Sequence, residues 1–136
     1  MALSRREFLA ASVAAALTRC LPHARAAQDP PFALGVASGY PHPRGCTLWT
    51  RITAPAAGRV EVQWEIARDE QFRDIALRGA ADALPAWGHS VHVDVDGLEA
   101  DRWYWYRFTA LGARSTAGRT RTAPEAGTTA LKLALA

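Results

Sequence analysis

Residues 59–69 read RVEVQWEIARD, and this stretch decides which fold the sequence predicts. Apolar and polar side chains alternate along it with a period of two. The apolar positions are Val60, Val62, Trp64 and Ile66, and the polar positions between them are Glu61, Gln63 and Glu65. Successive side chains of an extended chain point to opposite faces. The pattern therefore predicts an antiparallel strand with one face in a core and the other in water.

On both sides of this stretch, further short apolar segments are separated by clusters of turn-forming residues. The expected strands are residues 32–38, 46–53, 75–81, 89–95, 103–110 and 119–122. The expected turns include 39–45, where two prolines and two glycines argue against regular structure, as well as 83–88 and 112–118. Strands at this spacing without helical periodicity predict an all-β fold, an immunoglobulin/fibronectin III-like antiparallel β-sandwich. We expect this sandwich to follow an N-terminal signal peptide.

A tyrosine after an interstrand corner supports the sandwich. Leu98 stands six positions before Tyr104, a spacing similar to the tyrosine corner of immunoglobulin-like and fibronectin type III domains. In that motif the tyrosine hydroxyl bonds the backbone at the corner. We expect a structural role for Leu98 and Tyr104.

The N-terminus has the three parts of an export signal. An arginine pair precedes a short apolar run at 9–17, and small residues follow at two positions that a signal peptidase reads. The run is shorter than the ~20 residues that span a bilayer. The motif residues resemble a twin-arginine signal, with cleavage after residue 26: Ser4, Arg5, Arg6, Phe8 and Leu9, then Ala24 and Ala26. A plain N-terminal helix or anchor is one alternative; a lipoprotein at Cys20 is another, although Arg19 stands where a small residue is required.

This signal predicts passage through the twin-arginine translocase, contact with the membrane only during export, and a periplasmic or secreted location. It also contains the excess charge. The chain has 16 Lys+Arg and 13 Asp+Glu, a formal net charge of +3. Four of the arginines and one glutamate lie in residues 1–26, so the remainder is neutral and gives no indication of nucleic-acid binding.

Three groups could carry chemistry, and each has a plainer explanation. His92 and Asp94 share a strand face, but two ligands on a surface are more typical of solvated side chains than of a metal site. Cys46 would be the only cysteine of the mature chain, and its apolar setting favours a buried side chain over a reactive thiol. Arg119 and Arg121 could contact an anion or simply be solvated. Ser38 stands fourth in GVASG, so it does not form a nucleophile elbow.

Residues 103–110 have aromatic side chains on both faces. Tyr104, Tyr106 and Phe108 form one face, and Trp103, Trp105 and Arg107 form the other. A core covers only one face of a sandwich strand. We expect Trp103, Trp105 and Arg107 to contact another domain, or to be covered by a local loop such as the one that carries Trp87.

Five motifs in order resemble the N-terminal domain of the PhoD-type alkaline phosphatases. They are FALGVASG at 32–39, LWTR at 48–51, VHVDVDGL at 91–98, WYWYRF at 103–108 and GRTRTAP at 118–124. The resemblance implies a β-sandwich at 32–124 after a linker at 27–31. It also implies that 125–136 are a linker and the first strand of a calcineurin-like metallophosphatase domain. That domain would bind iron and calcium, with its ligands, including an early cysteine, beyond residue 136.

The resemblance therefore implies no catalytic and no metal-binding residue in this chain. We expect the noncatalytic N-terminal module of an enzyme that hydrolyses phosphate mono- and diesters, present as a fragment and inactive alone. The alternative is a free-standing exported immunoglobulin-like domain that binds carbohydrate or protein through exposed aromatic residues such as Trp87 and Trp105. An enzyme in its own right has almost no support in the sequence.

Overall fold

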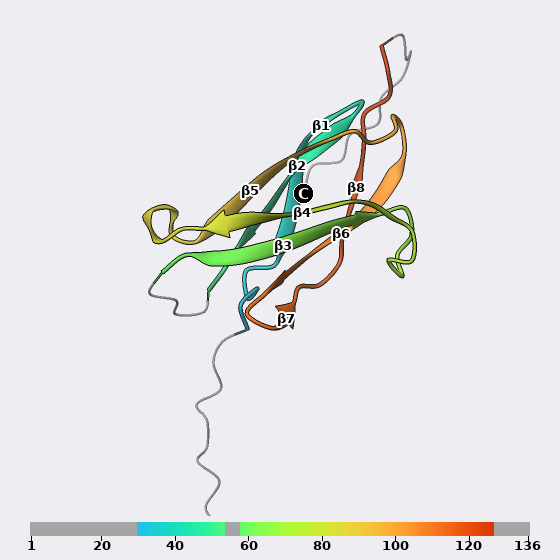
Figure 1. Ribbon diagram of the computed structural model, residues 1–136. Coiled ribbons are helices and arrows are strands. Elements are labelled where there is room, and N and C mark those ends of the chain that lie inside the picture. The colour runs from blue at the N-terminus through green and yellow to red at the C-terminus, as the bar shows by residue number, and fades with distance from the viewer. Residues whose placement is uncertain (1–29, 54–57, 127–136) are drawn as a thin grey trace, which may run out of the picture.

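The computed structural model describes residues 30–53 and 58–126, which form two antiparallel sheets packed face to face (Figure 1). The first sheet has the order β1-β2-β5, formed by Val36–His42, Gly45–Arg51 and Ser90–Asp96. The second has the order β4-β3-β6, formed by Ile75–Ala83, Val60–Ala67 and Trp103–Ala110, and both β7 (Ala113–Arg114) and β8 (Gly118–Arg121) pair with β6. The predicted all-β sandwich is confirmed.

The core lies between the sheets and contains the apolar face predicted for β3. Val60, Val62 and Ile66 are buried, while Glu61 and Gln63 on the other face are exposed. The opposing sheet contributes alternate residues of β2 and β5, and β6 contributes its tyrosines and phenylalanine. The buried apolar side chains of these three strands are Cys46, Leu48, Val91, Val93, Val95, Tyr104, Tyr106, Phe108 and Ala110.

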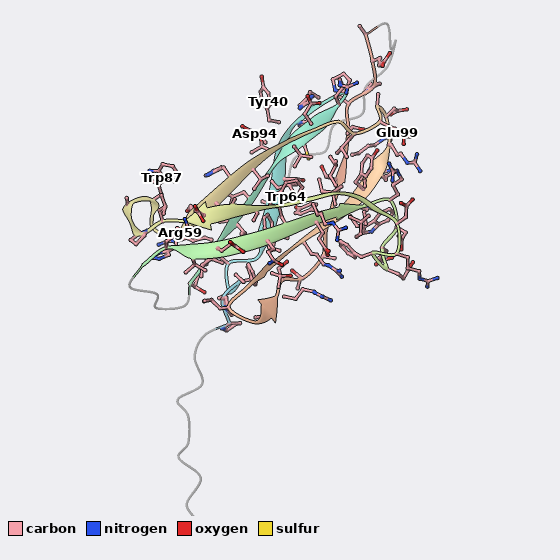
Figure 2. All side chains as sticks on the ribbon, viewed as in Figure 1. Tyr40, Arg59, Trp64, Trp87, Asp94 and Glu99 are labelled. Atoms are coloured by element: carbon pink, nitrogen blue, oxygen red, sulfur yellow. The ribbon has the colours of Figure 1, made fainter. Side chains whose placement is uncertain are left out.

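Trp64 explains the glycine inside β4. Gly79 is the cross-strand partner of Trp64, and a Cβ at this position would lie 2.6 Å from Cζ2 of the indole. Since that distance is shorter than any ordinary carbon contact, only glycine lets the ring lie across β4. Trp64, labelled in Figure 2, therefore occupies space that a side chain on β4 would otherwise fill.

The predicted limits of the first strand are wrong. Residues 31–34 form a turn, and β1 runs on to His42 through the segment 39–42 that the Gly and Pro content assigned to a turn. β1 is an edge strand, so the missing N–H of Pro41 costs no ladder bond. A register shift between Gly39 and His42 accommodates Tyr40 at a φ of 48°. Only residues 43–44 form the turn.

Two other expected turns contain short regular elements. β4 continues to Ala83, which is buried opposite Val60, and Pro85–Trp87 form one turn of 3-10 helix. Residues 113–114 form β7 because Leu111 and Gly112 both have positive φ angles, the geometry of a tight hairpin.

The predicted export signal and the predicted continuation lie outside the described residues. This applies to residues 1–29, including Ser4, Arg5, Arg6, Phe8, Leu9, Ala24 and Ala26, and to residues 127–136. In the segments that the structure does describe, no helix has the length and hydropathy needed to cross a bilayer.

Candidate functional site

The outer face of β6 gathers the residues that the sequence singled out for contact with another domain. Trp103 is 43% exposed, and Trp105 and Arg107 are half-buried. β8 lies beside β6 and pairs Arg121 with Trp103 and Arg119 with Trp105. We call this surface the Trp–Arg face; it consists of Trp103, Trp105, Arg107, Arg119 and Arg121.

Arg107 is held in place from two directions. Its Nη2 and Nε lie 2.7 and 2.8 Å from Oε2 of Glu65, its cross-strand partner on β3. Its guanidinium carbon lies 3.9 Å from the ring centroid of Phe72, which belongs to the turn between β3 and β4. Arg107 is therefore covered by a local turn, and its charge is already paired.

Among the described residues, no turn covers Trp103 in this way, and its ring is contacted by two arginines instead. The guanidinium carbons of Arg119 and Arg121 lie 4.3 and 5.6 Å from its ring centroid, within the range of cation–π attraction. Arg121 also donates to Asp101 Oδ1 at 2.7 Å. The exposed end of the face is thus an aromatic surface bordered by positive charge, a combination that suits an apolar partner with an acidic rim.

The corner before β6 positions Trp103. Tyr104 is fully buried, and its hydroxyl accepts a hydrogen bond of 3.0 Å from the N–H of Glu99. Thr122 Oγ1 donates to the carbonyl of Glu99 at 2.7 Å and accepts from the N–H of Arg102 at 3.1 Å. These bonds join the loop before β6 to the segment after β8.

Leu98 anchors the other end of the corner. It is 5% exposed, and its N–H donates to the carbonyl of Arg44 at 2.8 Å. The Glu99 side chain faces outward, where a hydrogen bond from Arg102 lowers its pKa. Sequence reasoning missed Thr122. The alternation of Arg119 and Arg121 with two threonines was the available signal, because a threonine on the inward face must find backbone partners.

His92 and Asp94 lie on the outer face of the first sheet, and the part of the chain that the structure describes supplies no third ligand beside them. Asp94 accepts a hydrogen bond of 2.7 Å from Thr47, its partner on β2, so this carboxylate forms a cross-strand pair. His89 instead lies near the carbonyl of Gly58, at 3.0 Å. Among residues 30–53 and 58–126, no group of three or more His, Cys, Asp or Glu could hold a metal ion.

The family is established by comparison with known proteins. Residues 15–124 match the family described as PhoD-like phosphatase, N-terminal domain. The chain belongs to this family. It is 45% identical over 104 residues to alkaline phosphatase D of Bacillus subtilis (strain 168), covering 71% of this chain and 18% of that protein. A solved structure described as "Structure of PhoD" matches with a TM-score of 0.70 and 43% identity, covering 72% of this chain and 20% of that one.

The chain thus spans about a fifth of the length of these relatives, and the catalytic domain of PhoD-like phosphatases is not covered by it. The residue range of the family match ends at 124, at the end of the strand-forming segment.

In this PhoD-like domain Cys46 is a core residue. Its side chain is 1% exposed between the sheets. Burial raises the pKa of the thiol, so the neutral form is favoured and nucleophilic thiolate is disfavoured. The side chain of Ser38, the other candidate nucleophile, forms a hydrogen bond with the side chain of Tyr106.

Trp87 does not cover the Trp–Arg face. It is 69% exposed and follows Ala83, which pairs with the first residue of β3, whereas Trp105 pairs with Ala67 at the other end. The two ends of this eight-residue strand are seven steps apart, about 23 Å at the usual rise. Figure 2 shows Trp87 at the opposite end of the domain from Glu99. Trp87 and Trp105 therefore do not form one contact surface.

Proposed function

We propose that this domain is the noncatalytic N-terminal module of an exported PhoD-like alkaline phosphatase and that its Trp–Arg face docks on the catalytic metallophosphatase domain. The parent enzyme would hydrolyse phosphate mono- and diesters with iron and calcium bound in that second domain. The described residues of this chain do not fit such metals, because they hold no group of ligands. The domain would contribute to the parent enzyme by packing against its catalytic domain.

The position of Trp103 carries this proposal. Trp103 pairs with Arg121, the last residue of β8, and the chain leaves the sandwich after Ala123, whose backbone still bonds Asp101 and His42. A domain attached after residue 126 would follow Arg121, the cross-strand partner of this exposed ring, by five residues. Tryptophan and arginine are among the residues most enriched at the energetic centres of protein interfaces, and this face brings Trp103 and Trp105 together with their cross-strand partners Arg121 and Arg119.

The polar side chains of the domain support a noncatalytic role, since they are used by the scaffold. Glu65 pairs with Arg107, Asp94 bonds Thr47, and Asp69 accepts three backbone N–H bonds inside the turn after β3. The backbone bonds, that of Asp74 foremost, lower the pKa of Asp69. These carboxylates hold strands and a turn together, which is a structural use of their charge.

A chimera tests the docking. Residues 30–126 of this chain would replace the matching segment of alkaline phosphatase D of Bacillus subtilis, and phosphate-ester hydrolysis would be measured before and after heating. We expect the chimera to be active. We expect Trp105→Ala to shorten its half-life on heating about tenfold, as the loss of one interface anchor worth ~1–2 kcal/mol implies. The matched control is Trp87→Ala, which alters an exposed tryptophan at the other end and should change nothing.

Two results would contradict the proposal. One is a chimera whose activity and thermal inactivation are the same with Trp105→Ala as without it. The other is turnover of a chromogenic phosphate ester by this chain alone in the presence of iron and calcium. Binding of a carbohydrate or protein by the isolated chain, lost in Trp105→Ala while the chimera is unaffected, would favour the free-standing binding domain.

Residues 1–26 would direct export in this proposal. The pair Arg5 and Arg6 would bring the chain to the twin-arginine translocase, and the product would be periplasmic or secreted. In cells that carry this pathway, the double variant Arg5→Lys, Arg6→Lys should leave almost all of the chain inside the cell, as measured by fractionation and immunoblot. Arg19→Lys, outside the motif, is the control. Undiminished export of the double variant would exclude this route.

A further inference from the structure

β4 is a long edge strand without the usual protection against pairing with another chain. It pairs only with β3 among the described residues, over the whole length of Ile75–Ala83. On an edge strand every second residue directs its N–H and C=O groups away from the sheet. Proline, lysine and an interrupting bulge are common protections. β4 contains neither residue, and its register shift lies at the Ile75 end.

The other edge strands of the two sheets are less suited to pairing with a second chain. β1 contains Pro41 and a register shift, and the carbonyl of His42 accepts a backbone bond from Ala123. β7 and β8 are short. β5 presents Asp94 and Asp96 but contains no arginine or lysine that could pair with them in a second copy. β4 is therefore the edge on which an additional strand would meet least resistance.

The exposed side chains of β4 are complementary to themselves. They are Arg78, Ala80 and Asp82, at alternate positions on the outer face. When two copies of β4 pair antiparallel about a two-fold axis at Ala80, each Arg78 lies opposite Asp82 of the second copy, and the small Ala80 side chains meet at the centre. We propose that two copies of this chain associate through β4 in this register, which joins the two second sheets into one continuous sheet.

Other registers lose this match. An axis at Gly79 or at Ala81 places Arg78 and Asp82 opposite uncharged residues, and an axis at Arg78 or at Asp82 places like charges together. A shift of one residue turns the apolar face of the second copy toward solvent. The charges thus favour one register among the neighbouring ones, which is the specificity that a two-fold interface requires.

The neighbours of Arg78 and Asp82 leave both side chains able to pair with a second copy of the chain. Glu65, the neighbour of Arg78 on β3, is occupied by Arg107, and in residues 30–53 and 58–126 no ion pair or hydrogen bond engages the Arg78 side chain. Asp82 contacts Arg59 through Oδ1 at 3.3 Å, on the surface, so its second oxygen can accept from another guanidinium. Glu61 lies opposite Asp82 on β3 and adds negative charge beside it.

Charge reversal tests this association in the full chain, by sedimentation equilibrium over a range of concentrations. The wild-type chain should form dimers. Arg78→Asp and Asp82→Arg should each raise the dimer dissociation constant by on the order of tenfold or more, since each replaces two attractive cross-strand pairs with two repulsive ones. An equimolar mixture of the two variants should dimerise again, because every position then meets its opposite charge.

The double variant Arg78→Asp, Asp82→Arg should also restore the dimer. Arg114→Asp, an exposed arginine on β7 in the same sheet, is the matched control and should leave the dissociation constant unchanged. Circular dichroism verifies that each variant remains folded. The inference is overturned by a wild-type chain that is monomeric at all concentrations, by a dimer indifferent to both single reversals, or by a mixture that does not recover. It does not depend on the proposed function.

Discussion

Replacing Phe108 with alanine is expected to lower the free energy of unfolding by about 3–5 kcal/mol, the range for removing a buried aromatic ring. Phe108 is fully buried, and its ring meets that of Tyr106 edge to face with centroids 6.4 Å apart. It is also the cross-strand partner of Trp64. Since a domain of this size is stable by roughly 5–15 kcal/mol in total, the variant should lose much of its stability. Urea unfolding followed by circular dichroism measures the loss.

The control lies on the same strand and faces the other way. Trp103→Ala removes a larger ring, but one that is partly exposed and contacts mainly the guanidinium groups of Arg119 and Arg121. Contacts of this type are worth about 0.5–1 kcal/mol each, so we expect a loss of about 1–2 kcal/mol. Equal losses for Phe108→Ala and Trp103→Ala would mean that the two faces of β6 have been assigned wrongly.

The faces of β3 and β6 could be predicted because register is strongly constrained when one side of a strand is buried. A slip of one residue at Val62 would bring Glu61 and Gln63 into the core, so the alternation in the sequence permits one arrangement only. The same reasoning separated Trp105 from Tyr106. Period-two patterns are local, and for this reason the sequence alone was enough to read them.

The limits of β1 could not be predicted because they depend on where the strand lies in its sheet. Pro41 would end a central strand, but at an edge its missing N–H faces solvent. The contact between Arg107 and the ring of Phe72 could not be predicted either, because it depends on how the β3–β4 turn folds over β6. Neither the edge position nor the contact across strands is visible in the neighbouring residues.

The Trp–Arg face could be predicted only in part from the sequence. The sequence identified Trp103 and Trp105 because a sandwich should have one wet face, and both faces of this strand are aromatic. It could not show that Arg107 is already paired with Glu65. The structure therefore narrows the candidate docking surface to its β8 side, where Trp103 is exposed and Arg119 and Arg121 flank it.

Loosening the tyrosine corner should have the second-largest effect. Tyr104→Phe removes the hydroxyl that accepts from the N–H of Glu99, and Thr122→Val removes the group that binds the carbonyl of Glu99 and the N–H of Arg102. Each change leaves part-buried backbone groups without their side-chain partner, at a cost of about 1–3 kcal/mol. Urea unfolding should show a loss of unfolding free energy in this range for both variants. Unlike substitutions in the β6 core, both should also expose backbone amides of the corner.

Hydrogen exchange of the Glu99 and Arg102 amides separates the corner from general destabilisation, because these N–H groups are the ones released. In Tyr104→Phe the Glu99 amide should exchange faster than global unfolding accounts for, and in Thr122→Val the Arg102 amide should do so. The double variant should lose less than the sum of the two single losses, since both side chains bind Glu99 and the first change already frees it. Full additivity, with both amides still protected, would show that Tyr104 and Thr122 stabilise the core independently. The corner would then not be what holds Trp103 at the start of β6.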